Sequence, residues 1–367
     1  MNSNIVLVAG GTGGHIWPAV SFGKWIENNK EGVNVNYICG SRPLEAEIYK
    51  SAGIVPFVLE MDGSPLSGRS WGQRLGRLRS LFSSFIRARG FLKKKQPCGC
   101  VLFAGYVSFP MIMACKSMGI PLVLHEQNAY AGKVTRIAAW LGIKIFTGWD
   151  SCQALAKSDY QAVGVPVRDF LKHNPKEAWA KLNVPADFPN SPRVVVMTGS
   201  LGSQSIKELI VKAADDEAFK GWTFVLPALS DSVVKIRDNV FLLPKIWDAS
   251  LLFGVADMAV VRAGGSTLTE VGTLGIPAVI IPWRGAADDH QRYNAAEYVK
   301  NNIGIVADDN QNYDSFKDKL LELYRTNRQN EQKCTNKLYN NVSIICEDFW
   351  LALSPEFERS ACCGTKQ

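Results

Sequence analysis

The chain has 367 residues, of which 47% are hydrophobic and 20% are charged, a composition typical of a soluble globular protein. Its length exceeds the size at which single hydrophobic cores stop growing, so two domains are predicted. No apolar run approaches the ~18 residues of a membrane span, and the first residues lack the basic region of a secretory signal, which predicts a cytoplasmic protein.

The net charge of +7 is concentrated in one region. Between Gly63 and His125 there are ten basic residues and no acidic residue, so the rest of the chain carries a small net negative charge. One local basic patch predicts a specific anionic surface as the partner, and it argues against general nucleic-acid binding.

The nine cysteines are scattered and form no CxxC or Cys/His ligand pattern. An odd count without such spacing predicts free thiols in a reducing compartment. No Asp-x-Asp signature is present either, so no metal is predicted.

The first predicted elements are a strand over Ile5–Ala9, a glycine turn over Gly10–Gly14 and a helix that runs to about Asn28. Glycines let a backbone approach a ligand closely, and a helix start favours a phosphate. A nicotinamide or flavin site is the alternative, although the third glycine of G-x-G-x-x-G is displaced and no acid directly follows the next strand, Val33–Cys39.

His15 lies where this first helix begins. A helix start favours a neutral imidazole over a charged one, which suits a general base near neutral pH. The alternative is a histidine that only shapes the loop.

Strands and helices then alternate, which predicts a doubly wound α/β domain. The expected elements are Val55–Leu59, Ser70–Gln96, Val101–Phe103, Phe109–Met118, Leu122–Leu124 and Ile143–Phe146. Polar segments follow two of the strands, Ala104–Ser108 and His125–Asn128, at the strand ends where open α/β sheets bind ligands. For His125 and Glu126, a structural role in orienting a loop stays open beside a catalytic one.

The segment Val163–Arg168 is expected to close the first domain, and the four prolines of Lys172–Pro192 predict a linker. A second strand, glycine loop and helix follow over Arg193–Ala214, which suggests duplicated Rossmann-like domains with a ligand between them. The tail from Asp314 is mostly helical, and Ile344–Leu353 is apolar enough to dock on a domain.

The stretch Val261–Glu297 predicts strand, glycine turn, helix, strand and a polar loop before another helix near Asp289. Its helix start suits a phosphate, Glu270 suits two ribose hydroxyls, and the polar loop suits a hydroxyl-rich ligand. A nucleotide-sugar is therefore predicted, and the alternative is an ordinary βαβ unit with solvated loops.

Seven motifs in register resemble the MurG family, the bacterial N-acetylglucosaminyltransferases of peptidoglycan synthesis, and the resemblance covers residues 4 to 310. The motifs are GGTGGHIWP from Gly10, GYVSFP from Gly105, HEQN from His125 with Ala131-Gly132, GVPVR from Gly164, GSLG from Gly199, Arg262–Glu270 and Asp289–Ala295.

The resemblance implies an α/β protein of GT-B fold, with two Rossmann-like doubly wound domains facing a central cleft. The implied domains are an acceptor and membrane domain over 1–168, a linker over 169–192, a UDP-GlcNAc domain over 193–340, and a helix crossing back to the first domain with a tail over 341–367. The implied reaction is inverting transfer of GlcNAc from UDP-GlcNAc to the MurNAc 4-hydroxyl of undecaprenyl-pyrophosphoryl-MurNAc-pentapeptide, which converts lipid I to lipid II. No metal or other cofactor is expected.

Site residues follow from the matching motif positions, with His15 as the candidate base. The implied donor-binding residues are Thr12, Gly13, Gly14, Asn128, Arg168, Ser200, Ile246, Ser266, Thr267, Glu270, His290 and Gln291. The implied acceptor-binding residues are Gly13, Gly14, Tyr106 and Ser108. Within these sets, Arg168 and the Ile246 backbone are expected at the uracil and Glu270 at the ribose.

The chain departs from the family pattern at His290, where paired glutamines are common, at Thr135, where an asparagine is common, and in the short stretch Phe224–Asn239. Two other functions stay open. A related GT-B lipid or natural-product glycosyltransferase would keep the donor half of the motifs, and so would a catalytically silent nucleotide-sugar-binding protein.

The helical stretch Ser70–Lys95 combines apolar residues at three- and four-residue spacing with a high density of arginine and lysine. Ordinary exposed helices mix charge signs, so a core-facing helix with a solvated side does not explain the missing acids. Peripheral attachment to an anionic membrane surface, on the cytoplasmic face, is therefore predicted through this stretch.

Overall fold

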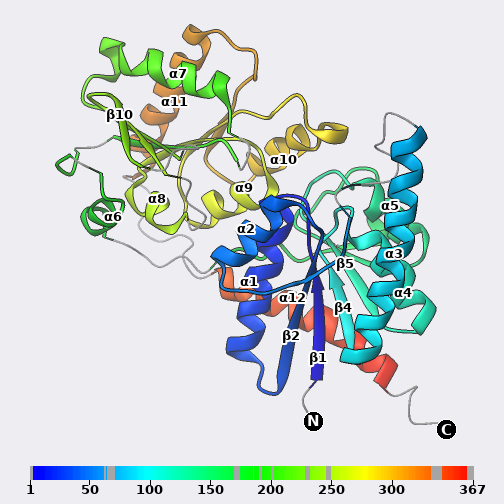
Figure 1. Ribbon diagram of the computed structural model, residues 1–367. Coiled ribbons are helices and arrows are strands. Elements are labelled where there is room, and N and C mark those ends of the chain that lie inside the picture. Colours follow the sequence, from blue (N-terminus) through cyan, green and yellow to red (C-terminus); the bar gives the residue numbers. More distant parts are fainter. Residues whose placement is uncertain are drawn as a thin grey trace. The chain divides into compact units, whose positions relative to one another are not determined.

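The computed structural model describes residues 3–61, 63, 71–168, 174–184, 186–189, 192–199, 202–227, 232–244, 249–331 and 341–361. The chain divides into two compact units, Met1–Arg168 with Val342–Gln367, and Asp169–Asn341. Each unit contains a seven-stranded sheet (Figure 1). Among the described helices, none is long and apolar enough to cross a membrane.

The first unit has a wholly parallel sheet in the order β3-β2-β1-β4-β5-β6-β7. Its strands are β1 Ser3–Val8, β2 Val33–Cys39, β3 Phe57–Val58, β4 Gly99–Leu102, β5 Leu122–Glu126, β6 Lys144–Thr147 and β7 Tyr160–Ala162. Its helices are α1 Gly13–Asn29, α2 Pro43–Ser51, α3 Trp71–Lys95, α4 Ser108–Met118, α5 Lys133–Trp140 and α12 Asn341–Ala361. The order reverses between β1 and β4, the switch point where doubly wound sheets bind ligands.

The two faces of this sheet are covered by different helices. Val6 and Val8 of β1 belong to a core with residues of α3, α4 and α5. Leu7 points to the other face, where it lies against Gly23 of α1. This alternation is the two-residue period of a strand buried on both sides, as a parallel sheet requires.

Helix α12 completes the core on the α1 face. Its Phe349 is fully buried, with ring centroids 4.5 Å from Phe22, 5.3 Å from Phe146 and 5.1 Å from His125. Burying one phenylalanine contributes about 1.5–3 kcal/mol to folding. The last helix is therefore part of the first unit's core, and the predicted docking of Ile344–Leu353 has this physical basis.

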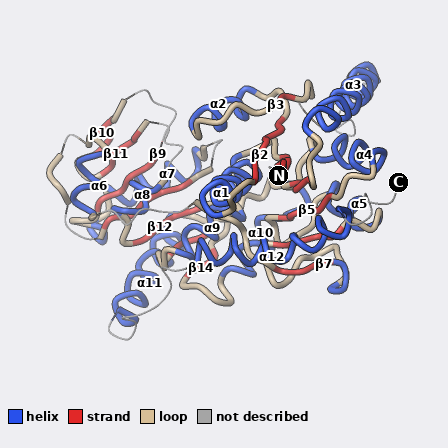
Figure 2. Tube along the Cα trace, turned by 90° about the horizontal axis from the view of Figure 1, so that it is seen from below, coloured by secondary structure: helices blue, strands red, loops and turns tan. Residues whose placement is uncertain are grey.

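The second unit repeats the topology in the order β10-β11-β9-β8-β12-β13-β14, where only the edge pair β10 and β11 is antiparallel among the described strands. Its strands are β8 Arg193–Met197, β9 Thr223–Pro227, β10 Val234–Arg237, β11 Val240–Leu243, β12 Met258–Val261, β13 Ala278–Ile280 and β14 Gly304–Val306. Its helices are α6 Pro175–Lys181, α7 Gln204–Ala214, α8 Ser250–Val255, α9 Gly265–Thr273, α10 His290–Tyr298 and α11 Tyr313–Glu331. Figure 2 shows the strands of each unit as neighbouring red segments with helices around them. The switch point falls between β8 and β12.

The segment expected to be a linker differs from that prediction. Part of it forms helix α6, which begins at Pro175 and is capped by the side chain of Asn174. Trp179 of this helix is 3% exposed and packs with Phe241, Leu243 and other residues of the second core. Pro175 thus marks a helix start, because proline at the first helical position loses no hydrogen bond.

Candidate functional site

The glycine turn after β1 is shaped by close contacts. A Cβ at Gly10 would lie 2.6 Å from Val107 and 2.8 Å from the Glu45 carboxylate, and Gly11 has a φ of +105°. Thr12 is the N-cap of α1, so Gly13 and Gly14 form the first turn of that helix. The turn Gly10–Gly14 lies at the β1/β4 switch point, and this position suits an anionic or sugar ligand.

His15 stands in the same turn and is held by Gln127. Its Nδ1 atom lies 2.6 Å from Oε1 of Gln127, which directly follows β5. The contact joins the loops that follow β1 and β5 at the carboxyl end of the sheet, on either side of β4. The ring is therefore fixed in place by a residue from the HEQN motif, a pairing that the sequence alone did not reveal.

Glu45 is a further residue that sequence reasoning missed. It is fully buried in the first turn of α2, and its carboxylate accepts hydrogen bonds from the backbone N–H groups of Gly11 and Gly40 at 2.7 Å each and from the Tyr106 hydroxyl at 2.6 Å. One anion thus fixes the loops that follow β1, β2 and β4. Pro43 at the helix start and the acid two residues later are the sequence signal that could have identified α2.

Tyr106 and Ser108, the expected acceptor-side residues, follow β4. The backbone enters this loop through Ala104 and Gly105, both with positive φ, and a Cβ at Gly105 would lie 2.9 Å from the Gly10 carbonyl oxygen. Burial and the bond to Glu45 raise the pKa of Tyr106, so its hydroxyl stays protonated. Ser108 is buried and donates to the Ala104 carbonyl. This loop therefore lies against the His15 loop, and the acceptor-binding role of Tyr106 and Ser108 stays a prediction.

Glu126 organises the segment that carries Asn128. Its carboxylate accepts bonds from the Asn128 side-chain amide and the Gly132 backbone N–H, each at 3.1 Å, and from the Thr135 hydroxyl. The side chain of Thr135 therefore makes a hydrogen bond inside this loop. Glu126 is 1% exposed, and these contacts favour the structural role that the sequence left open for it.

His125 is also buried, with its ring beside Phe103 and Phe349. Desolvation by burial lowers the pKa of this imidazole to about 4, and the ring is therefore neutral near pH 7. Its Nε2 atom lies 2.8 Å from the Gly164 carbonyl oxygen.

Arg168 is the last residue of the first segment of the first unit, Met1–Arg168. Its guanidinium lies 4.3 Å from the ring centroid of Trp17 in α1, a cation–π contact. The uracil contact expected of Arg168 stays a prediction.

In the second unit, the β12–α9 turn carries three predicted donor residues. Gly264 is the N-cap of α9, and Ser266, Thr267 and Glu270 lie in its first two turns. Ser266 and Glu270 are 7% and 4% exposed, so this is a largely buried helix start. The side-chain amide of Asn294 donates to the Ala263 carbonyl over 2.9 Å and fixes the turn from α10.

Arg262 connects this turn to its neighbours, a role that the motif did not reveal. Its guanidinium donates to the carbonyl of Ile281 after β13, to Asp309 at 2.6 Å, and to the Ser203 hydroxyl at 2.7 Å. Ser203 is the N-cap of α7 and ends the glycine loop after β8. One buried arginine therefore holds both loops of the β8/β12 switch point in register.

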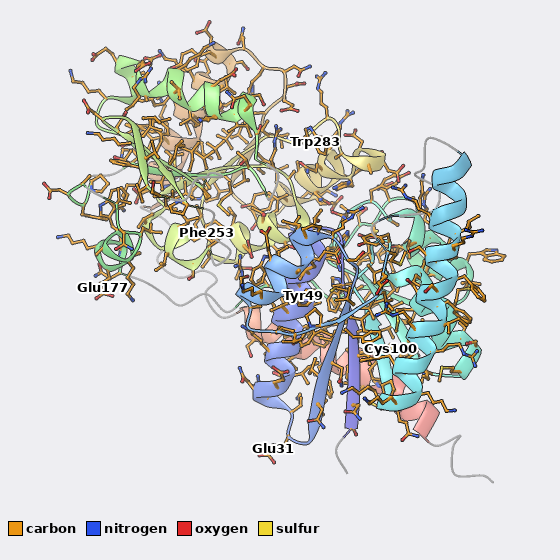
Figure 3. All side chains as sticks on the ribbon, in the orientation of Figure 1. Glu31, Tyr49, Cys100, Glu177, Phe253 and Trp283 are labelled. Atoms are coloured by element: carbon orange, nitrogen blue, oxygen red, sulfur yellow. The ribbon has the colours of Figure 1, made fainter. Side chains whose placement is uncertain are left out.

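His290 and Gln291 begin α10 after a strained turn. Asp288 and Asp289 both have left-handed backbones, with φ of 52° and 54°. His290 Nδ1 lies 2.8 Å from the Ala287 carbonyl oxygen, and Gln291 Oε1 accepts from the backbone N–H of Trp283 over 2.9 Å. Figure 3 labels Trp283 beside this helix. These contacts fix the first two residues of α10, His290 and Gln291, in place after the turn.

Two predicted donor residues, Ser200 and Ile246, lie outside the described residues. Within the described ranges, no cluster of three or more His, Cys, Asp or Glu side chains has the arrangement of a metal site. The six described cysteines, among them Cys39, Cys100 and Cys152, are free thiols.

Two α/β units with mostly parallel sheets, each with polar side chains and helix starts at its switch point, are typical of enzymes that use nucleotide-sugars. Residues 5–147 match the family described as "Glycosyltransferase family 28 N-terminal domain". Residues 193–346 match the family described as "Glycosyltransferase family 28 C-terminal domain". The chain belongs to glycosyltransferase family 28 and, within it, to the MurG family. The resemblance that the motifs indicated is confirmed.

One curated relative, the UDP-N-acetylglucosamine--N-acetylmuramyl-(pentapeptide) pyrophosphoryl-undecaprenol N-acetylglucosamine transferase of Francisella philomiragia, is 30% identical over 369 residues, covering 93% of this chain and 95% of that protein. The crystal structure of Acinetobacter baumannii MurG matches with a TM-score of 0.66 and 21% identity, over 94% of this chain and 99% of that one. The predicted GT-B fold class is thereby confirmed. A UDP-GlcNAc 2-epimerase from Neisseria meningitidis, solved with UDP-GlcNAc, matches with a TM-score of 0.61 and 12% identity over 95% of this chain and 99% of that one. The fold alone therefore does not distinguish a transferase from an epimerase.

Proposed function

We propose that this protein transfers GlcNAc from UDP-GlcNAc to the MurNAc 4-hydroxyl of undecaprenyl-pyrophosphoryl-MurNAc-pentapeptide. The observation that carries the proposal is the imidazole of His15, held at the carboxyl end of a parallel sheet by Gln127 in a chain whose full-length relative bears the name of that activity. A transferase needs a base for its acceptor hydroxyl, and histidine is the most common base near neutral pH.

In the proposed reaction, His15 takes the proton of the acceptor hydroxyl as its oxygen forms a bond to the anomeric carbon. The bond between that carbon and the UDP oxygen breaks at the same time, and UDP leaves with the electron pair. A single in-line displacement inverts the configuration at the anomeric carbon. The start of α9, at Ser266 and Thr267, supplies backbone N–H groups and a helix dipole for the negative charge that develops on the diphosphate.

The second unit is the proposed donor-binding unit. Glu270 is placed one turn after Ser266, where a carboxylate can accept from both ribose hydroxyls when the diphosphate lies at the helix start. His290 and Gln291, at the start of α10, are assigned to the sugar. The first unit supplies Asn128 and Arg168 to the donor, and Tyr106 with Ser108 to the acceptor.

We also propose that α3 attaches the enzyme to an anionic membrane surface. Leu81, Phe85 and Leu92 of this helix pack on the core, whereas Leu78, Phe82 and Ile86 are 53%, 68% and 52% exposed. These three recur every four residues, so they form one outward apolar stripe (hereafter the α3 stripe). Arg79, Arg89, Lys93 and Lys94 are exposed on the same helix.

An interfacial helix of this composition inserts its apolar side chains below the headgroups while its cations remain among the lipid phosphates. This arrangement would bring the enzyme to a lipid-linked acceptor without a membrane span. Its basic residues support an anionic leaflet as the partner.

The proposed function is tested with UDP-GlcNAc and a short-chain lipid I analogue, followed by detection of the disaccharide product. UDP-glucose and a purine nucleotide-sugar serve as donor controls. Product should form with UDP-GlcNAc at a rate well above both controls, because a site built on specific hydrogen bonds rejects ligands that leave them unmade. Absence of product, or equal thermal stabilisation by all three donors, would refute the proposal.

A further inference from the structure

We infer that Gln127 and His125 are positioning residues that set the tautomer of His15 and leave its Nε2 atom free to accept a proton. The inference rests on the proposed function, because it concerns the state of the proposed base. It follows from a continuous chain of hydrogen bonds that begins at the Gly164 carbonyl and ends at His15.

The first link fixes the tautomer of His125. The Gly164 carbonyl oxygen can only accept, so the Nε2 atom of His125, 2.8 Å away, carries the proton. His125 is fully buried and its pKa is lowered to about 4, so the ring holds only this one proton near pH 7. Its Nδ1 atom is therefore an acceptor.

The second link fixes the orientation of the Gln127 amide. Nε2 of Gln127 lies 2.9 Å from Nδ1 of His125 and 2.8 Å from the His125 carbonyl oxygen, and both of these atoms are acceptors. The amide nitrogen has two hydrogens, one for each. A reversed amide would bring its oxygen against two acceptors. The observed orientation of the amide is therefore the one that these two acceptor atoms require.

The third link fixes His15. Since the amide nitrogen of Gln127 faces His125, its Oε1 atom faces Nδ1 of His15 at 2.6 Å and can only accept. Nδ1 of His15 therefore carries the proton, and Nε2 of the neutral ring does not. This is the tautomer that a base acting through Nε2 requires.

The hydrogen bond between His15 and Gln127 does not have to change during the proposed reaction. When Nε2 takes a proton, Nδ1 keeps its own, so the bond to Gln127 persists and no proton has to move along the chain. A hydrogen bond donated by a charged ring is stronger than one from a neutral ring. Gln127 thus orients the base in both of its states without placing a negative charge beside it.

A direct test is nitrogen NMR of protein labelled with ¹⁵N-histidine, because the chain has only four histidines. Near pH 7, His125 should show a protonated Nε2 and a bare Nδ1, and the neutral form of His15 should show the opposite pair. His15→Gln and His125→Gln variants assign the signals. The reverse tautomer at either residue would overturn the inference, even if the enzyme turns over normally.

Kinetics of a Gln127→Met variant provide the second test. Methionine keeps the length of the side chain but makes none of the three bonds, so His15 should gain a protonated Nε2 and turnover should fall by about 10- to 100-fold, the usual cost of losing an orienting partner. The affinity for UDP-GlcNAc should stay within about twofold of wild type. Gln153→Met makes the same chemical change at an exposed site and should leave both quantities unchanged.

Wild-type turnover in Gln127→Met would overturn the inference, as would an unchanged His15 tautomer in that variant. The proposed function fails in a different way. If His15→Ala retained full turnover, the base assignment would be lost, whatever tautomer the wild-type ring shows.

Discussion

The Tyr106 hydroxyl donates a 2.6 Å hydrogen bond to the carboxylate of Glu45, which lies 61 residues earlier in the chain. The same carboxylate accepts from Gly11 and Gly40, so a single buried anion stabilises three loops at the carboxyl end of the sheet. The shape of the His15 loop therefore depends on a buried residue outside the predicted donor-binding and acceptor-binding sets.

Glu45→Ala should lower the free energy of unfolding by about 3 kcal/mol, because two backbone N–H groups and a hydroxyl lose their acceptor inside the protein. Tyr106→Phe removes one donor and keeps the carboxylate, so it should cost about 1 kcal/mol. Urea denaturation of the two variants measures both quantities. Equal losses in the two variants would show that Glu45 is not the shared anchor.

His15→Ala should reduce turnover by about 10²–10⁴-fold and leave the affinity for UDP-GlcNAc nearly unchanged, because a general base acts mainly in the transition state. Steady-state kinetics with the short-chain lipid I analogue and a separate donor titration give the two numbers. Turnover close to wild type would return His15 to a role in shaping the loop.

Charge reversal on α3 tests membrane attachment. The triple variant Arg79→Glu, Lys93→Glu and Lys94→Glu should lose binding to anionic vesicles, since each basic residue near such a surface contributes about 1 kcal/mol. It should use long-chain lipid I poorly and still turn over a water-soluble acceptor. Vesicle sedimentation at low and at physiological salt measures the binding.

The matched control reverses three exposed lysines of the second unit, Lys176, Lys181 and Lys212, and so makes the same change in net charge. It should keep vesicle binding. Equal losses in both triple variants would mean that overall charge, and not α3, governs attachment. Phe82→Ser should weaken binding further by removing an exposed ring from the α3 stripe.

Ala104 has a left-handed backbone with a φ of 51°, a conformation that costs a residue with a Cβ about 1–2 kcal/mol. Ala104→Gly should therefore raise the free energy of unfolding by up to about 1 kcal/mol. The control is Ala114→Gly in the regular interior of α4, which should lower it by about 1 kcal/mol or more. Thermal unfolding of the pair checks the opposite signs.

The buried His125 should make folding stability depend on pH. Its pKa is about 4 in the folded protein and 6.5 as the ordinary value, so between these values the unfolded chain binds more protons. Stability contributed by the neutral ring is therefore present above pH 6.5 and is lost as the pH falls. From pH 7.5 to pH 5 the wild type should lose about 2 kcal/mol more than His125→Gln. Identical pH profiles of unfolding for the two proteins would contradict this assignment.

Much of the fold could be predicted from the sequence. The strand Val33–Cys39 and the strand Met258–Val261 agree with the structure residue for residue. The first begins with alternating apolar and polar residues, and the second is an apolar run buried on both faces. Both patterns are clear signatures of a strand. Helices α2 and α5 were not predicted. They have nine and eight residues, a length at which helical stability comes from tertiary packing more than from the local sequence.

The candidate site could be predicted only in part. Glycine turns and strand ends identified the loops that carry His15, Tyr106 and Glu270, because those signals are local in the sequence. The supporting contacts of Glu45, Gln127 and Arg262 are not local. Glu45 lies 34 positions from Gly11, Gln127 lies 112 positions from His15, and Arg262 lies 59 positions from Ser203. A single sequence contains no signal for such pairings.

On α3, the sequence did not separate the apolar residues that pack on the core from those that face outward. Leu81 and Phe85 pack on the core, whereas Leu78 and Phe82 are exposed. Three- and four-residue spacing covers more than half of a helix circumference when so many positions are apolar. Periodicity alone could not separate the two faces.

The position of Phe349 has a consequence for protein synthesis. This side chain packs against Phe22, Phe103 and Phe146, yet the ribosome makes it only after the whole second unit. During translation the apolar surface that α12 later covers stays exposed on the first sheet while some 170 further residues are added. The second unit, made in one piece, is free to fold during that interval, and the order of completion is the reverse of the order along the chain. A nascent chain halted before α12 would accordingly be a substrate for chaperones.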